Sequence, residues 1–329
     1  MLRAKRITPV PASPVDPSKD NPLRGYATAF LDWTGTIGLS EQTAAVRSQA
    51  LDYFIRWCDE RSIRHPSEVS RAVLERYQRY LFHYRKKGGE PLAFSTQATR
   101  LNPLKAFFKW LARERHIAYN PASELVMPKL PKRLPQYVLT VEEVERILSE
   151  PDCSKPSGIR DRAIIELLYS TGLRRMELAK LKVHDVNLGH GTLMVRGGKG
   201  GKDRMVPVGS RATAWLTKYL ADIRPGLTAA TDDGTLFLTD FGESFEKHRL
   251  GDMVKRYIAN AGIPAPGACH LFRHACATHM LENGADIRFI QAMLGHAQLS
   301  TTEIYTQVSI SKLKEIHAAT HPAQVPRRS

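Results

Sequence analysis

A proline-rich stretch near the middle of the chain limits the possible folds more than any other feature. Residues 121–136 contain Pro121, Pro128, Pro131 and Pro135. Proline has no amide hydrogen and fixes φ, so these prolines exclude a continuous helix or a central strand. Because a chain of 329 residues is also long for one core, the sequence predicts two domains joined by an extended basic linker over 121–136.

The part before this linker has the hydrophobic pattern of a small helical bundle. Apolar residues recur at helical spacing in three stretches that follow a shorter one around 26–33. The three stretches are approximately 41–62, 67–86 and 96–116. We expect Ser67 to cap the second helix and Gly88 and Gly89 to stop it.

Positive charge is concentrated in the same part of the chain. The net charge is +15, and residues 1–136 carry 23 Lys and Arg against 12 Asp and Glu, whereas residues 137–329 carry 25 against 21. A basic helical face without compensating acids indicates nucleic-acid binding, although many such faces are simply solvated. The candidate DNA contacts are Arg71, Arg76, Arg79, Arg100 and Lys105.

The cysteines and the chain ends point to a reducing, aqueous compartment. Cys58, Cys153, Cys269 and Cys276 are scattered and form no C-x-x-C pair, which disfavours disulfides and zinc fingers. The basic start is not followed by an apolar run, and no stretch approaches the ~20 apolar residues that cross a membrane. We therefore expect a soluble cytoplasmic protein without membrane contact.

The part after the linker combines helices with a β-hairpin. Thr140 and Glu143 form a capping-box signature at a helix start, and 160–170 has the pattern of a buried helix. Residues 192–196 and 204–208 are predicted strands around a Gly/Lys-rich turn. Further helices are expected over 213–223, 247–261, 270–283 and 287–294.

Several residues of this second part suit phosphate chemistry. His270 and Arg273 share one helix face at i, i+3 spacing, and guanidinium groups bind phosphate oxygens in pairs. Arg174 and Glu177 have the same spacing, so the carboxylate can hold the guanidinium. Each pair alone is more often an ordinary surface pair.

Three further candidates follow from the turns. Gly295 is a natural helix C-cap that places His296 in a tight turn. Lys199 lies in the hairpin turn, where a flexible ammonium can reach a leaving oxygen, although such turns are also common as exposed loops. Tyr305 follows His296 by nine residues; a single tyrosine usually only packs.

Taken together in this order, the motifs resemble those of the tyrosine recombinases, also called phage integrases, especially Xer-type and integron-type members. The likeness rests on Thr-Gly-Leu-Arg-Arg-Met-Glu-Leu, His-Leu-Phe-Arg-His-Ala-Cys-Ala-Thr-His and Leu-Gly-His-Ala-Gln-Leu-Ser-Thr-Thr-Glu-Ile-Tyr-Thr. It covers about residues 137–310 closely. The front half resembles the family's helical, SAM-like core-binding domain more loosely. The resemblance implies a mainly α fold with a small antiparallel sheet, arranged as a two-domain C-shaped clamp.

The resemblance also implies a role for each site residue. Tyr305 would attack the scissile phosphate to give a 3′-phosphotyrosyl link and a free 5′-hydroxyl. The transition state would be stabilised by Arg174, Arg273 and His296. Lys199, chosen over Lys202, would protonate the leaving oxygen, and His270 would assist proton transfer at Tyr305. Glu177 would orient Arg174, which is chosen over Arg175. Because one phosphodiester is exchanged for another, no metal, ATP or other cofactor is expected.

The domains expected from these features follow the chain in order. They are a flexible arm over 1–22, a core-binding domain over 23–120, the linker over 121–136, a catalytic domain over 137–308 and a tail helix over 309–329. The resemblance implies that the tail packs on a neighbouring protomer, in a homotetramer, or a heterotetramer with a second recombinase, on two double-stranded DNA duplexes at a specific site. The tail could instead fold back on its own domain.

Two other functions fit the same residues. A type IB topoisomerase-like enzyme would relax supercoiled DNA by similar chemistry, but such enzymes usually carry large additional segments. A non-catalytic DNA-binding protein would keep the fold without the reaction, but all six expected catalytic positions are filled. Recombination in DNA integration, excision, transposition or dimer resolution is therefore the predicted function.

Overall fold

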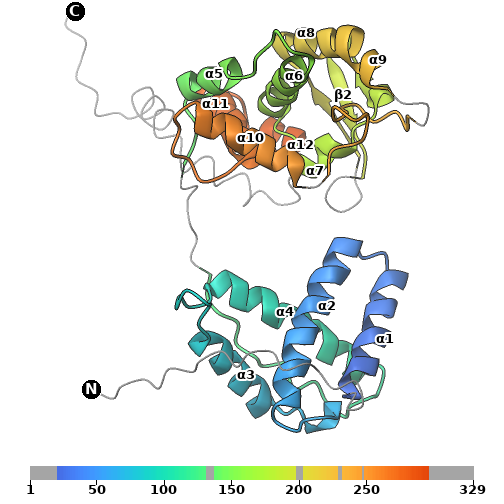
Figure 1. Cartoon of the computed structure of the whole chain (residues 1–329). Coiled ribbons are helices and arrows are strands. Elements are labelled where there is room, and N and C mark those ends of the chain that lie inside the picture. The colour runs from blue at the N-terminus through green and yellow to red at the C-terminus, as the bar shows by residue number, and fades with distance from the viewer. Residues whose placement is uncertain (1–20, 131–136, 198–202, 229–231, 247, 296–329) are drawn as a thin grey trace, which may run out of the picture. The chain divides into compact units, whose positions relative to one another are not determined.

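The computed structural model describes residues 21–130, 137–197, 203–228, 232–246 and 248–295. The chain divides between Lys132 and Arg133 into two compact units, each with its own core (Figure 1). The division falls inside the proline-rich stretch, where the sequence predicts a linker.

The first unit consists of helices around an aromatic core. Its helices are α1 (Leu23–Thr36), α2 (Glu41–Asp59), a 3₁₀ turn (Pro66–Glu68), α3 (Arg71–His83) and α4 (Phe94–Arg113). Helix α4 contacts α1, α2 and α3, and Phe30, Phe54, Tyr77, Phe107 and Phe108 are fully buried among them. The predicted helical bundle is therefore confirmed.

The start and the end of α3 differ from the expectation. Ser70, not Ser67, is the N-cap, and its hydroxyl accepts a hydrogen bond from the amide of Val73 at 3.4 Å. Ser67 lies inside the preceding 3₁₀ turn, which begins at Pro66, and its hydroxyl is hydrogen-bonded to the ring of His65 at 3.0 Å. The helix also ends at His83 because Tyr84 is extended, before the turn that contains Gly88 and Gly89.

The first part of the proline-rich stretch belongs to the first unit. Ala122 and Leu125 are buried in its core, and the ammonium of Lys105 donates a hydrogen bond to the Leu125 carbonyl at 3.2 Å. Prolines exclude regular structure here, but they do not prevent apolar side chains between them from packing.

The second unit surrounds a buried central helix, α6 (Pro156–Thr171), which contacts α5, α8 and α11. The elements around α6 follow in chain order: α5 (Val141–Ser149), α7 (Arg175–Lys180), a 3₁₀ turn (Val183–Asp185), α8 (Ser210–Lys218), a π-helical turn (Tyr219–Ile223), α9 (Arg224–Leu227), α10 (Arg249–Asn260), α11 (Cys269–Glu282) and α12 (Ile287–Leu294). The predicted buried helix is confirmed, and so is the capping box, since Thr140 accepts from Glu143 N and the Glu143 carboxylate accepts from Thr140 N.

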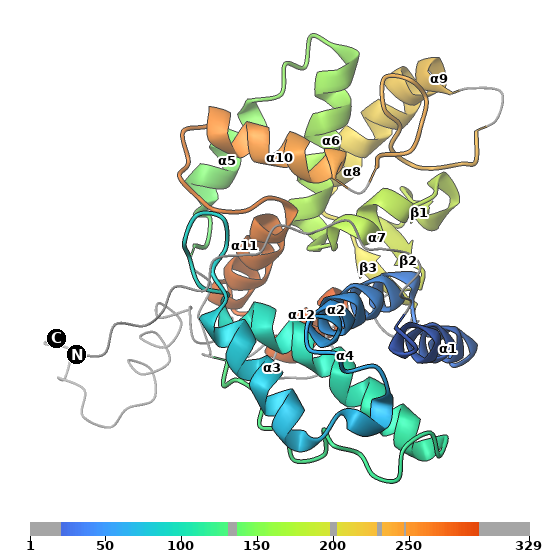
Figure 2. The same cartoon turned by 60° about the horizontal axis from the view of Figure 1, so that its bottom comes forward.

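A three-stranded antiparallel sheet lies at one edge of this unit, beside α7 (Figure 2). It contains β1 (Val186–Asn187), β2 (Thr192–Val195) and β3 (Arg204–Pro207) in the order β1-β2-β3. The hairpin of β2 and β3 is confirmed, whereas β1 is too short to give a period-2 signal. The fold is thus mainly α with a small antiparallel sheet. Across the described ranges, no helix is both long and apolar enough to cross a membrane.

Candidate active site

The site is built where the end of α6 meets the end of α12. Gly172 terminates α6 in the left-handed conformation, with φ +59°. A Cβ at this position would lie 2.5 Å from Cδ2 of Leu294, so a larger residue would displace that side chain and would also be strained at this positive φ. The glycine therefore lets the chain turn directly into α7 beside α12.

Arg174 is the N-cap of α7, and Glu177 in the first turn holds it in place. The Arg174 Nη1 donates to Glu177 Oε1 at 2.7 Å, and the Arg174 amide donates to Oε2 at 2.9 Å. The Arg174 Nη2 also donates to the Gly295 carbonyl at 3.2 Å. The neighbouring Arg175 instead packs against Gly251 of α10, which supports Arg174 as the phosphate ligand.

Arg273 reaches the same place from α11. Its side chain is buried, and it donates from Nη1 to the Gly172 carbonyl at 2.6 Å and from Nη2 to the Leu294 carbonyl at 2.8 Å. The two arginines predicted to bind phosphate are therefore brought together by the ends of α6 and α12.

A third arginine, Arg204, completes the cluster, and it is not among the site residues predicted from the sequence. Arg204 of β3 donates from Nη1 to Glu177 Oε1 at 3.0 Å and from Nη2 to Oε2 at 2.7 Å. Its Nε donates to the Met293 carbonyl at 2.9 Å. Strand alternation could have revealed it, because Arg204 shares a strand face with the fully buried Val206 and a charge on that face requires a partner.

The side chains of three arginines thus donate hydrogen bonds to the C-terminal turn of α12. The carbonyls of Met293, Leu294 and Gly295 accept from Arg204, Arg273 and Arg174, respectively. These carbonyls carry the partial negative charge of a helix end, which cations stabilise. The predicted C-cap is confirmed, since Gly295 is left-handed with φ +65°.

Burial and hydrogen bonding act in opposite directions on Glu177. Burial raises its pKa, but the hydrogen bonds from Arg204 and from the backbone and side chain of Arg174 outweigh it, and the pKa is lowered from 4.5 to about 2. Glu177 is therefore a carboxylate at neutral pH, and it holds both guanidinium groups.

His270 lies near the start of α11, on the exposed side of the helix. Its ring is near that of His274, with centroids 6.0 Å apart. Partial burial lowers the pKa of His270, and burial together with the charges of His270 and Arg273 lowers the pKa of His274 to about 4. A neutral imidazole at position 270 can accept a proton at pH 7.

Lys199, His296 and Tyr305 lie outside the described residues. In the sequence, however, His296 directly follows Gly295, and Lys199 precedes β3. The described cluster therefore lies next in sequence to two of the three remaining candidates.

The candidate DNA contacts of the first unit are not alike. Arg71 forms ion pairs with Glu75 and Glu124, so the interpretation of a face without compensating acids is wrong at this residue. Lys105 is bonded to a carbonyl of its own unit, as described above, and Arg100 lies over the ring of Tyr53 at 4.1 Å.

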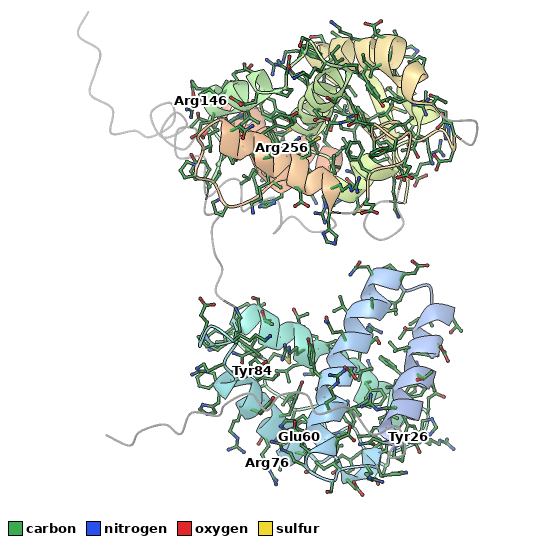
Figure 3. The ribbon with its side chains drawn as sticks, in the orientation of Figure 1. Tyr26, Glu60, Arg76, Tyr84, Arg146 and Arg256 are labelled. Carbon is green, nitrogen blue, oxygen red and sulfur yellow. The ribbon has the colours of Figure 1, made fainter. Side chains whose placement is uncertain are left out.

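Arg76 and Arg79 of α3 differ from these three. Both are exposed, and Arg76 is labelled in Figure 3. Within the described part of the chain, neither has an ion pair with an acidic side chain. Arg76 and Arg79 are therefore the two exposed candidates whose charge no acidic side chain compensates among the described residues.

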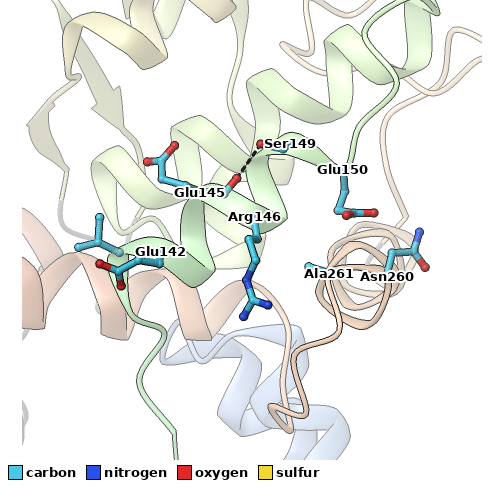
Figure 4. A pocket seen from close by; sticks show the side chains of 8 residues that line it. Glu142, Glu145, Arg146, Ser149, Glu150, Asn260 and Ala261 are labelled. Atoms are coloured by element: carbon cyan, nitrogen blue, oxygen red, sulfur yellow. Dashed lines mark hydrogen bonds between the residues drawn. The ribbon is translucent and has the colours of Figure 1, made fainter.

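A cavity of about 550 Å³ between α5 and α10 is not a suitable DNA site. Glu142, Glu145 and Glu150 line it together with Arg146 (Figure 4), so its net charge would repel phosphate. Among the described residues, no group of three or more His, Cys, Asp or Glu side chains is placed to hold a metal ion.

Comparison with known proteins identifies the chain's relatives. The sequence model of the phage integrase family matches residues 137–312, and that of the phage integrase N-terminal SAM-like domain matches residues 29–117. The chain belongs to the phage integrase family of tyrosine recombinases. It is therefore a DNA strand-exchange enzyme, and the matched range contains every residue of the cluster described above.

Individual relatives agree with this assignment over nearly the whole chain. The recombinase is 55% identical to tyrosine recombinase XerC 2 of Ralstonia nicotianae over 96% of this chain and 92% of that protein. It is 37% identical to tyrosine recombinase XerD of the same organism, over 94% and 96%. The crystal structure of XerH bound to its palindromic difH substrate matches with a TM-score of 0.68 at 22% identity, over 93% and 98% of the two chains, and supports the fold.

Proposed function

We propose that the recombinase cleaves and rejoins double-stranded DNA through a covalent bond between Tyr305 and a 3′-phosphate, and exchanges strands between two duplexes. The observation that carries this proposal is the meeting of Arg174 and Arg273 at the end of α12, directly before His296. Transfer of a phosphoryl group concentrates negative charge on the non-bridging oxygens, and preorganised cations stabilise that charge.

Arg174 retains hydrogen-bonding capacity for a phosphate. A guanidinium group has five N–H donors, and the two side-chain bonds of Arg174 go to Glu177 and Gly295. Its side chain is 29% exposed, whereas that of Glu177 is 8% exposed. Glu177 thus fixes the guanidinium from the protein side, while the other side is open to DNA.

The remaining residues move protons. The Tyr305 hydroxyl attacks phosphorus, its proton passes to the neutral His270, and the bond from phosphorus to the 5′ oxygen breaks. Lys199 protonates that oxygen, while Arg174, Arg273 and His296 bind the non-bridging oxygens. Religation reverses these steps with a 5′-hydroxyl of the partner strand. One ester replaces another, so the reaction requires neither ATP nor a metal-activated water.

Each domain has a separate role in this reaction. We assign DNA binding to residues 23–120, catalysis to 137–308, and protomer contact to the tail 309–329, in a homotetramer or a heterotetramer with a second recombinase. One related structure is XerH bound to difH DNA, and the named Xer relatives come from bacteria. We therefore place the recombinase in the bacterial cytoplasm, acting on a specific site in DNA.

This function can be tested before the target site has been identified. Cells that express the recombinase are lysed in detergent, and DNA that stays on the protein after denaturation is sequenced. We expect recovery of one short site that reacts with a second copy to give recombinant products. Relaxation of a single plasmid without recombinants would instead favour the topoisomerase-like alternative.

DNA affinity should depend steeply on salt because phosphate contacts release counterions. If the four candidates other than Arg71 each contact a phosphate, affinity should fall by about 10²-fold between 50 mM and 200 mM salt. Replacing Arg76 and Arg79 by Ala should reduce the log–log slope by about 2, measured by fluorescence anisotropy. The control Arg71→Ala should change the slope less, because Arg71 is already paired with Glu75 and Glu124. A change of about 1 for Arg71→Ala, equal to the change per residue in the double variant, would contradict the assignment.

A further inference from the structure

We propose that Arg204 is a positioning residue for strand cleavage. Its side chain links strand β3 of the β2–β3 hairpin to the end of α12 and holds Glu177 against Arg174. This inference rests on the proposed function. It assigns no contact with DNA to Arg204 and concerns only the geometry of the groups that make such contacts.

The contacts of Arg204 leave it facing protein. Its side chain is 12% exposed, and three donors, Nε, Nη1 and Nη2, are directed at Met293 and the two carboxylate oxygens of Glu177. The planar guanidinium group can donate two hydrogen bonds to a carboxylate and a third to a carbonyl at the same time. The ammonium group of lysine cannot reproduce this geometry. Arg204 is therefore placed to hold other groups.

The two ends of this connection matter for catalysis. Arg204 begins β3, five positions after Lys199 in the sequence. At the other end it packs on Gly295, where a Cβ would lie 3.0 Å from Cδ of Arg204, and His296 follows Gly295 directly. One side chain thus connects the segments next to the proposed general acid and the proposed phosphate-binding histidine.

The carboxylate of Glu177 is shared, and this sharing gives Arg204 an influence on Arg174. Glu177 Oε1 accepts from Arg204 Nη1 and from Arg174 Nη1, while Oε2 accepts from Arg204 Nη2 and the Arg174 amide. Without Arg204, each carboxylate oxygen keeps only its hydrogen bond from Arg174, and nothing on the β3 side holds Glu177 in place. The orientation of Arg174 that phosphate binding requires would then be held less firmly.

Arg224 provides a matched control. Its side chain is 11% exposed, it binds both carboxylate oxygens of Asp232, and it donates to the Thr235 carbonyl at 2.7 Å. It therefore has nearly the same burial and the same kinds of partner in the same unit, but none of its hydrogen bonds with described residues is to the cluster around α12. A loss of general stability should affect Arg204→Gln and Arg224→Gln alike.

The experiment measures covalent protein–DNA adducts in single turnover, at saturating DNA, with the full chain. Arg204→Gln should cut about 100-fold more slowly than the wild type, with DNA affinity changed by less than about twofold, while Arg224→Gln should cut within about twofold of the wild type. Added guanidinium ion at millimolar concentration should restore part of the rate to Arg204→Ala, whereas sodium ion should not.

The outcomes separate the two proposals. A wild-type protein without adducts would contradict the proposed function itself. Adducts in the wild type, with equal rates for Arg204→Gln and Arg224→Gln, would overturn the positioning role alone. If thermal unfolding shows that Arg204→Gln is not folded, Arg204→Lys takes its place in the test. A cleavage rate about 10-fold below that of the wild type supports the positioning role, and a wild-type rate overturns it.

Discussion

Replacing Tyr305 with Phe should abolish covalent protein–DNA adducts and leave DNA binding almost unchanged. Phenylalanine keeps the ring but removes the oxygen that would form the bond to phosphorus, so the loss should be complete within detection. The binding energy comes mainly from basic contacts to the DNA backbone, which this change does not touch. Gel electrophoresis after denaturation measures the adducts, and anisotropy measures binding.

A neighbouring hydroxyl provides the control for this substitution. Thr306→Val also removes one hydroxyl, at the next position in the sequence, and should still form adducts. If Tyr305→Phe still trapped DNA at its 3′ end, another residue would be the nucleophile.

Glu177→Gln should produce a large loss of stability in the second unit. The substitution leaves Arg174 and Arg204 next to each other without their shared anion, and breaking a buried charge pair in this way costs about 3–5 kcal/mol. Chemical denaturation followed by circular dichroism measures the free energy of unfolding of this unit. Cleavage should fall together with stability, because Arg174 loses its fixed orientation.

Glu145→Gln is the matched control for this change. Glu145 accepts two hydrogen bonds from Arg211, at 2.8 Å and 3.0 Å, but its side chain is 46% exposed. Surface pairs of this kind contribute less than about 1 kcal/mol. Equal losses for the two variants would show that burial of the carboxylate at position 177 does not matter.

The contribution of Glu177 should also depend on pH in a defined direction. Its folded pKa is lowered from 4.5 to about 2, so its stabilisation is fully present above about pH 4.5 and is lost as the pH falls toward 2. This linkage amounts to roughly 3 kcal/mol. The difference in unfolding free energy between the wild type and Glu177→Gln should therefore shrink over this range, and a constant difference would contradict the assignment.

The sequence predicted the parts of the fold that depend on local patterns. The capping box at Thr140, the glycine C-cap at Gly295 and the β2–β3 hairpin are all set by neighbours a few residues apart. Two serines lie within four positions at the start of α3, so the pattern alone does not decide between them. Ser70 is the cap, because Ser67 lies inside the 3₁₀ turn and its hydroxyl is hydrogen-bonded to the ring of His65.

Parts of the site could be predicted for the same reason, and others could not. Arg174 and Glu177 are at i, i+3 spacing, so their contact is local. Arg204 reaches Glu177 over 27 positions and Met293 over 89, and only the packing of β3 against α12 brings them together. The ion pairs of Arg71 with Glu75 and Glu124 include the same kind of distant partner, which a charge count does not show.

Identification of the linked atoms is the most direct test of the proposed chemistry. DNA trapped on the recombinase is digested with nuclease and the protein with protease, and mass spectrometry locates the modified residue and the DNA end. We predict a nucleotide joined through its 3′-phosphate to Tyr305, with a free 5′-hydroxyl on the other fragment. A link at any other residue, or a 5′-phosphate on the protein, would contradict the proposed chemistry.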